Sequence, residues 1–260
     1  YNVASQIWTK YFGHDGTATN PIVFRNYPGE TATITSNVGT VFVIERDYNR
    51  VEGLNFVGGP ATATWFFVAY DVVATHFTAS RCIASMGSDG DNTGFVYLSE
   101  GASGTVVEHC RITGPGHDMS LHWNTAGIIC FRPEGVRFIN NEISNTMNGI
   151  YFKHANSQDN LTPGIEIAYN YIHDTGFKAM QLNCNHASIH DNVIGANNAD
   201  IQVTAANGAP GGDGNVFAHN TFADGIKFDL CYDTQGPDTA PGAIANVLRA
   251  NLFTAQMWAH

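Results

Sequence analysis

The sequence predicts an all-β fold, a right-handed parallel β-helix of about eight coils that forms one domain over residues 1–260. Three observations predict it. The chain repeats a short pattern at intervals of 22 to 31 residues, the repeated segments resemble short strands, and the composition favours turns over helices. We also expect the sequence to lack its N-terminal coil, because Tyr1 opens in what resembles mid-domain sequence.

The repeat has one anchor residue in each coil, which is asparagine in the five C-terminal coils. A large apolar residue stands three positions before the anchor, and another stands two positions after it. The eight anchors are Leu54, Ser80, Cys110, Asn141, Asn170, Asn192, Asn220 and Asn251. The shortest interval is 22 residues, from Asn170 to Asn192, and the longest is 31, for example from Asn220 to Asn251.

Stacked coils share one core, because a single coil cannot bury its own apolar side. We therefore expect burial of the residues three positions before the anchors: Val51, Phe77, Val107, Phe138, Ile167, Ile189, Phe217 and Leu248. We expect the same of those two positions after: Phe56, Cys82, Ile112, Ile143, Ile172, Ile194, Phe222 and Phe253. Each anchor asparagine should lie at a turn and hydrogen-bond the asparagines above and below, which satisfies amides that a bend exposes.

A second strand follows most anchors, at 94–100, 127–133, 149–155, 179–185, 199–205 and 225–231. Alternation of side chains along a strand predicts which of them face outward. The outward residues should be Tyr151, Lys153, Gln181, Asn183, Gln202, Thr204, Lys227 and Asp229. In-register stacking then predicts a row of Lys153, Asn183, Thr204 and Asp229, about 4.8 Å apart from coil to coil.

The composition limits the classes of partner. Only 13% of residues are charged, and the formal net charge is −11. A field of that sign repels nucleic acid, so we expect no nucleic-acid partner. No apolar run is long enough to span a bilayer, so we expect no membrane span. The five cysteines are irregularly spaced, which is not the pattern of a disulfide framework, and we expect most of them in the core.

The segment 20–33, NPIVFRNYPGETAT, and the coils from Val51 to Phe253 resemble the parallel β-helix superfamily of pectate lyases, chondroitinase B and alginate lyases. The resemblance covers nearly the whole chain. It implies a secreted or periplasmic enzyme whose partner is an acidic polysaccharide, and whose reaction is cleavage of a uronic-acid polymer by β-elimination. Calcium is the one cofactor that the resemblance suggests, with Asp89, Asp91 and Asn92 as oxygen ligands at alternate positions.

β-Elimination needs a base, a proton donor for the leaving oxygen, and groups that neutralise the substrate carboxylate. We predict Lys153 as the base and Tyr151 as the proton donor, since both are outward residues of a middle coil. Substrate-binding groups follow on the neighbouring coils: Arg132, Gln181, Asn183, Lys227 and Asp229. Two histidines are the other candidates for the base, namely His154, which ends the same strand, and His173. We predict no metal ligand among these site residues.

Other functions remain open at this point. A β-helix hydrolase needs at least two carboxylates on the strand face, and the outward rows supply Asp229, with Asp200 at a strand start. An epimerase would share the same fold. A carbohydrate-binding or adhesive β-helix without catalysis would use aromatic platforms such as Trp8, Trp65, Trp123 or Trp258.

Overall fold

The computed structural model describes residues 2–3, 5–12, 14–36, 39–58, 65–69, 74–87, 92–116, 124–131, 134–154, 164–195, 200–205, 212–223, 227–233, 245–254 and 258–259. Apart from one short 3-10 helix, η1 (Thr9–Phe12), every regular element in these ranges is a β-strand. No helix in the described part of the chain is long and apolar enough to cross a membrane.

Three parallel sheets, which we call A, B and C, run the length of the solenoid. Sheet A contains ten strands: β1 (Asn2–Val3), β4 (Thr33–Ser36), β7 (Asn55–Gly58), β10 (Ile83–Ser85), β13 (Arg111–Thr113), β16 (Glu142–Ser144), β19 (Tyr171–His173), β22 (Val193–Gly195), β25 (Thr221–Ala223) and β28 (Leu252–Phe253).

Sheet B also contains ten strands: β2 (Ile7–Trp8), β5 (Thr40–Ile44), β8 (Trp65–Ala69), β11 (Gly94–Leu98), β14 (Ala126–Phe131), β17 (Asn148–His154), β20 (Lys178–Leu182), β23 (Asp200–Ala205), β26 (Lys227–Asp233) and β29 (Trp258–Ala259). Sheet C contains nine: β3 (Ile22–Arg25), β6 (Asn49–Glu52), β9 (Thr78–Ser80), β12 (Val106–Glu108), β15 (Arg137–Ile139), β18 (Glu166–Ala168), β21 (Ser188–His190), β24 (Val216–Ala218) and β27 (Val247–Arg249).

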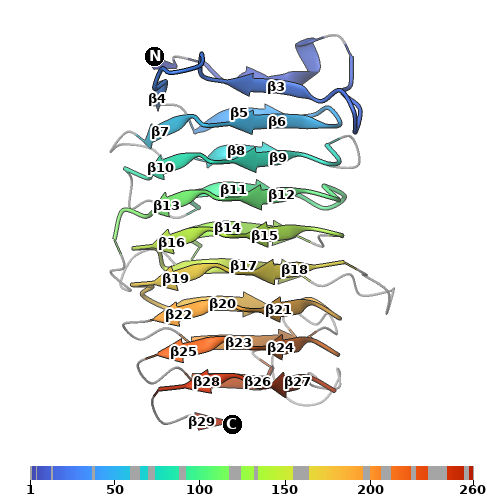
Figure 1. Ribbon diagram of the computed structural model, residues 1–260, viewed down its shortest axis with the longest axis vertical. Coiled ribbons are helices and arrows are strands. Elements are labelled where there is room, and N and C mark those ends of the chain that lie inside the picture. Colours follow the sequence, from blue (N-terminus) through green and yellow to red (C-terminus); the bar gives the residue numbers. More distant parts are fainter. Residues whose placement is uncertain are drawn as a thin grey trace.

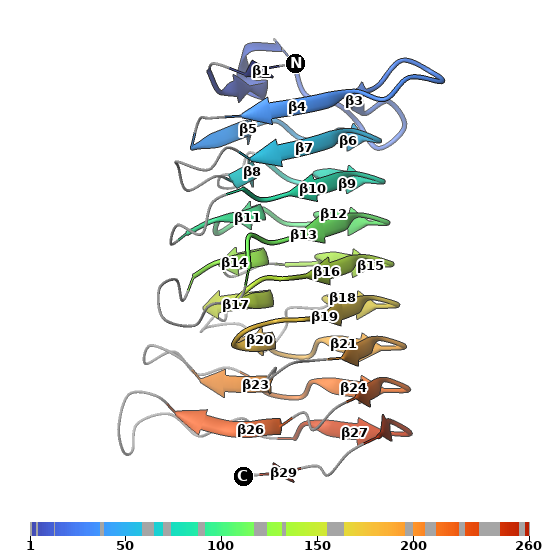
Figure 2. The ribbon, with the colours of Figure 1, turned by 90° about the vertical axis from the view of Figure 1, so that its left-hand side faces the viewer.

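Each coil runs from sheet C to sheet A and then to sheet B, and the next coil stacks below it (Figure 1). Figures 1 and 2 together show the chain turning clockwise as it moves away from its N-terminal end, which is a right-handed solenoid. The predicted parallel β-helix is therefore confirmed. The sheets contain nine or ten strands each, so the number of coils differs slightly from the predicted eight, because β1 to β4 lie before the first predicted anchor, Leu54.

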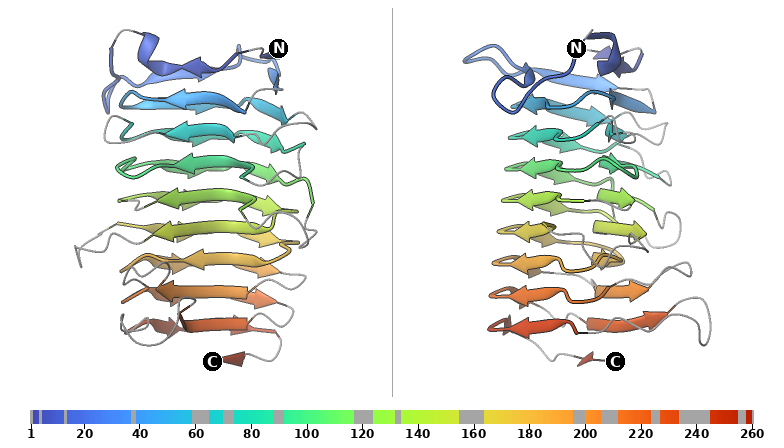
Figure 3. Two further views of the ribbon diagram at one scale, coloured as in Figure 1. Left: turned by 180° about the vertical axis from the view of Figure 1, so that it is seen from behind. Right: turned by 90° about the vertical axis from the view of Figure 1, so that its right-hand side faces the viewer.

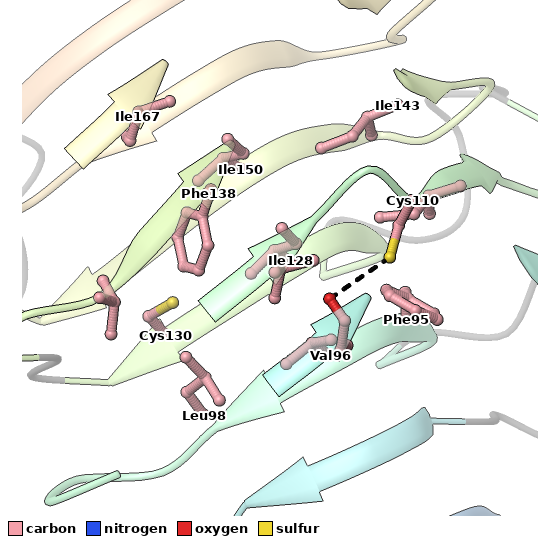
Figure 4. Packing of buried hydrophobic residues seen from close by; sticks show 14 of the residues in the cluster. Phe95, Val96, Leu98, Cys110, Ile128, Cys130, Phe138, Ile143, Ile150 and Ile167 are labelled. Atoms are coloured by element: carbon pink, nitrogen blue, oxygen red, sulfur yellow. Dashed lines mark hydrogen bonds between the residues drawn. The ribbon is translucent and has the colours of Figure 1, made fainter. Parts of the chain in front are cut away.

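The core lies between the three sheets and continues from coil to coil, with Phe138, Ile143, Ile150 and Ile167 among its buried side chains (Figure 4). Most of the residues predicted to be buried are less than 3% exposed. Two residues of the last described coil are exceptions: Leu248 is 38% exposed, and Phe253 is only partly buried. Leu248 lies in the same row as Phe217, with which it pairs, but β27 is the last described strand of sheet C, so no described strand of that sheet covers it from below.

The predicted asparagine ladder is present at the turn from sheet C to sheet A. Nδ2 of Asn141, Asn170, Asn192 and Asn220 donates to Oδ1 of the next asparagine over 2.9–3.0 Å, ending at Asn251. Each Nδ2 also donates to a backbone carbonyl of the coil above, for example from Asn192 to Ile167 over 2.8 Å. The ladder thus joins each coil to both of its neighbours.

The residue before the anchor adopts a left-handed backbone conformation in eight successive coils. The φ values are 68° at Gly53, 53° at Arg81, 55° at His109, 56° at Asn140, 58° at Tyr169, 55° at Asp191, 56° at His219 and 51° at Ala250. This geometry corrects one predicted anchor. Arg81 takes the left-handed position, and Ala79 pairs with Val51 and Val107, so the anchor of that coil is Cys82 and not Ser80. Phe77 and Cys82 are both buried nonetheless.

Candidate functional site

The outer face of sheet B carries the predicted site, and Figure 3 (left) shows this sheet from outside. Strand pairing aligns one outward row along seven coils: Val68, Tyr97, Ile129, Tyr151, Gln181, Gln202 and Asp229. The row is apolar or aromatic down to Tyr151 and polar after it. The change from apolar to polar side chains therefore occurs at the coil of β17, which also carries Lys153.

Lys153 lies at an irregularity in the pairing of β14 with β17. Cys130 pairs with Phe152 and Phe131 pairs with His154, which leaves Lys153 as the extra residue of β17. Its Nζ donates to Oδ1 of Asn124 over 3.4 Å and lies 5.5 Å from the centre of the Phe131 ring. The ammonium group is therefore held half-buried over the outer face of sheet B, between an amide and an aromatic ring.

Tyr151 lies on the same strand, packed against an apolar cluster on the outer face. This cluster consists of Trp65, Val68, Ala126 and Ile129, with Tyr97, Phe131 and Tyr151 packed against it. The Trp65 and Tyr97 rings meet at 5.3 Å between centroids, and the Tyr97 and Phe131 rings at 5.2 Å. Burial in these surroundings raises the pKa of the Tyr151 phenol above its ordinary value. Tyr151 is consequently a protonated group that can donate a hydrogen bond or a proton.

Two of the predicted outward residues are arranged differently. Asn183 is fully buried, because β20 ends at Leu182 and the alternation of a strand does not extend to it. Asp229 pairs with Gln202, and Thr204 pairs with Tyr232 after a register shift, so Asp229 aligns with the row of Tyr151 and not with Thr204. The predicted row of Lys153, Asn183, Thr204 and Asp229 is therefore wrong.

Of the remaining predicted site residues on sheet B, the structure describes the side chain of Gln181 but not the others. Gln181 is half-buried beside Tyr151 in the outward row. The backbones of His154, Lys227 and Asp229 lie in strands of sheet B, but their side chains are outside the described part of the structure, and Arg132 is outside it altogether.

His173 lies on sheet A rather than sheet B, at the end of β19. Its ring stacks on Tyr171 at 4.2 Å, its Nδ1 lies 2.7 Å from Oδ2 of Asp174, and its Nε2 lies 3.6 Å from Oε1 of Glu142. The imidazole is therefore engaged with two carboxylates of its own sheet and the adjoining turn. The structure brings Tyr151, Lys153 and Gln181 together on sheet B, and it places His173 on a different sheet.

Sequence reasoning missed Lys178, the first residue of β20. Its side chain is only 6% exposed, and its Nζ lies 4.6 Å from the centre of the Phe177 ring. Lys178 aligns with Asn148 of the coil above. Both residues begin a strand of sheet B, and both are buried. A lysine directly before the alternating segment Ala179–Leu182 was the available signal, but the predicted strand began one residue too late to include it.

No group of three or more histidine, cysteine or acidic residues in the described part of the chain is arranged to hold a metal ion. Of the residues suggested for calcium, Asp89 and Asp91 lie outside the described ranges, and Asn92 is exposed in the turn before β11.

No protein-family model matches this sequence, and no curated protein is significantly similar to it. What the chain does must therefore be argued from the fold and from the residues that the fold brings together on sheet B.

Proposed function

We propose that this protein is a carbohydrate-active β-helix that binds an acidic polysaccharide along the outer face of sheet B and cleaves it by β-elimination. The observation that carries the proposal is the pairing of Lys153, held over sheet B by Asn124 and Phe131, with the protonated Tyr151 two residues before it. Solenoids of this fold are suited to polymer substrates, because stacked coils present a long, regular face.

The proposed reaction assigns one group to each proton transfer. Lys153, as a free amine, takes the proton α to the substrate carboxylate. The electron pair left on that carbon forms a carbon–carbon double bond and expels the glycosidic oxygen, and the Tyr151 phenol protonates this leaving oxygen. The side-chain amide of Gln181, next to Tyr151 in the outward row, donates to the carboxylate while negative charge accumulates on it.

A hydrolase receives less support from the same face. Hydrolysis of a glycosidic bond requires a pair of carboxylic acids across the scissile bond. In the aligned row from Val68 to Gln202, whose side chains are described, no residue is acidic. Asp200, Asp229 and Asp233, whose side chains lie outside the described part, are the acidic residues within sheet B strands that a hydrolase would use.

A binding protein without catalysis is the second candidate, favoured by the partly exposed Tyr97, Phe131 and Tyr151 rings on the same face. Aromatic faces bind the apolar C–H surfaces of sugars without any chemistry.

The decisive experiment is a panel of alginate, pectate and glycosaminoglycans assayed for two products, unsaturated chain ends by ultraviolet absorbance and reducing ends by a colour reaction. The proposal expects both signals together. Lys153→Ala should abolish turnover, and Tyr151→Phe should lower kcat at least 100-fold, while Lys10→Ala serves as a control on a distant lysine.

Reducing ends without unsaturation would contradict the lyase and favour the hydrolase. Binding by isothermal calorimetry with no product from any polymer would favour the binding protein. Wild-type turnover in Lys153→Ala would move the base elsewhere, with His154 and His173 next in line.

A further inference from the structure

We infer that Cys82 and Cys110 form a site for a reversible disulfide that joins two neighbouring coils. Both residues occupy the anchor position of the turn from sheet C to sheet A. The N–H of Arg81 donates to Glu108 O over 3.0 Å, and the N–H of Arg111 donates to Cys82 O over 2.9 Å, so the two turns are paired on both sides of the cysteines. Directly stacked residues have Cα atoms about 4.8 Å apart, within the range that a disulfide spans.

The two thiols are buried and point in the same sense. Cys82 is fully buried and Cys110 is 2% exposed. Sγ of Cys110 donates to Ala79 O in the coil above over 3.6 Å, and Figure 4 draws this bond. Sγ of Cys82 makes the equivalent bond one coil higher, to Val51 O over 3.7 Å. The thiol of Cys110 is therefore directed toward the coil of Cys82.

The two sulfurs are not equivalent. A hydrogen bond with Cys110 lowers the pKa of the Cys82 thiol, whereas burial raises the pKa of the Cys110 thiol well above its ordinary value. Cys82 therefore ionises first, with Cys110 as the donor that stabilises its thiolate. In thiol–disulfide exchange this makes Cys82 the attacking sulfur and Cys110 the resolving sulfur.

The reaction needs a low-molecular-weight disulfide as oxidant. The Cys82 thiolate attacks one sulfur of the oxidant and releases one small thiol, which leaves a mixed disulfide. The Cys110 sulfur, losing its proton, then attacks Cys82 Sγ and releases the second small thiol. The oxidant is reduced by two electrons, and the protein gains one disulfide between two positions that lie 28 residues apart in the sequence.

The chain supplies an internal control in Cys130 and Cys184, which are also buried. Cys130 lies on β14, whereas Cys184 follows β20, with the coil of β17 between them. Two coil rises separate them by about 10 Å, which is too far for a disulfide. All four of these cysteines are buried, but only Cys82 and Cys110 lie in adjacent coils. The second pair therefore shows whether burial alone, without stacking, is enough for disulfide formation.

The experiment treats the folded protein with oxidised glutathione, blocks free thiols with N-ethylmaleimide and maps the digest by mass spectrometry. The expected product is a peptide pair joining Cys82 to Cys110, which dithiothreitol reverses. Thermal unfolding of the oxidised protein should occur several degrees higher than that of the reduced protein. Cys82→Ser and Cys82→Ala should lack both the linked peptides and the increase, whereas Cys184→Ser should keep both.

Because the thiols are buried, the oxidation is repeated in urea below the unfolding transition, where local opening exposes them. A disulfide that involves Cys130 or Cys184, or glutathione that stays on Cys82 without resolution, would overturn the inference. Absence of the Cys82–Cys110 link under both conditions would overturn it as well.

Discussion

The turn from sheet C to sheet A is built differently in the two halves of the solenoid. From Asn141 to Asn251 the anchors are asparagines, whose side chains bond to one another and to the coil above. In the N-terminal half the anchors are Leu54, Cys82 and Cys110. Each thiol retains the bond to the carbonyl of the coil above but does not continue the chain of amides.

The cores of the two halves also contain different kinds of apolar side chain. The N-terminal half contains a cluster of phenylalanines, among them Phe56, Phe67 and Phe95, whose rings meet at 5.1–6.4 Å. The C-terminal half is packed largely with isoleucines such as Ile167 and Ile194. One half is thus held by ring packing and the other by directional amide bonds. Stacking requires that the turn amides be satisfied and the core filled, and different residues meet those needs in each half.

The largest effect should come from opening the core where the halves meet. Phe138 is fully buried, and its ring lies 6.0 Å from that of Phe152. Phe138→Ala should lower the free energy of unfolding by about 3–5 kcal/mol, because a cavity remains that the stacked coils cannot close. Urea denaturation followed by circular dichroism measures it. Ile167→Ala should cost about 2–5 kcal/mol, and a loss below 1 kcal/mol in both would mean that the core collapses to fill the space.

The next effect tests the ladder itself. Asn192 donates to Ile167 O and Asn220 Oδ1, and its own Oδ1 accepts from the backbone and side-chain N–H groups of Asn170. Asn192→Ala should cost about 3 kcal/mol, since it leaves several buried polar groups without partners. Amide hydrogen exchange should accelerate at Asn170 first. Equal losses for Asn192→Ala and for a substitution at an exposed residue such as Val193 would contradict the ladder's contribution.

A smaller effect of opposite sign should follow from extending the ladder toward the N-terminus. Asn141 Oδ1 already accepts the backbone N–H of Cys110 over 2.9 Å. Cys110→Asn should add an amide bond to Asn141 and a stronger bond to Ala79 O than the thiol makes, which together raise the free energy of unfolding by about 1 kcal/mol. Destabilisation in thermal unfolding would show that the N-terminal turn is too tightly packed for a carboxamide.

The smallest effect concerns an ion pair between coils on the outside of sheet C. The hydrogen bond from Arg137 Nε, 2.7 Å long, lowers the pKa of the Glu166 carboxyl below its ordinary value of 4.5, with a smaller contribution from His190. A depressed pKa in the folded state gives stability that is present above pH 4.5 and is lost as the pH falls through the folded value. Since the pair is partly exposed, the contribution should stay below about 1 kcal/mol.

Glu166→Gln should remove this part of the pH dependence. Unfolding measured from pH 7 down to pH 3 should show a shallower decline in the variant than in the wild type, and the two curves should converge at the acidic end. Parallel curves over the whole range would mean that the ion pair contributes nothing.

The sequence by itself determined the parallel β-helix, the asparagine ladder and nearly all of the core. These features recur in every coil, so they can be recognised by comparing the coils with one another. The position of a residue such as Ile143 or Asn170 in its coil follows from the equivalent residues in the coils above and below. Alternation also predicted Tyr151, Lys153 and Gln181 on one outer face, and strand pairing aligns Tyr151 with Gln181.

Only the tertiary structure decided the features that break the repeat. The extra residue in β17, the pairing of Asp229 with Gln202, the burial of Asn183 and Lys178, and the exposure of Leu248 all depend on how one coil fits the next. Alternation within a strand cannot reveal a change of register between strands, since that register is set by pairing across coils. The candidate site lies among these irregularities, so the sequence indicated its face while the structure set its geometry.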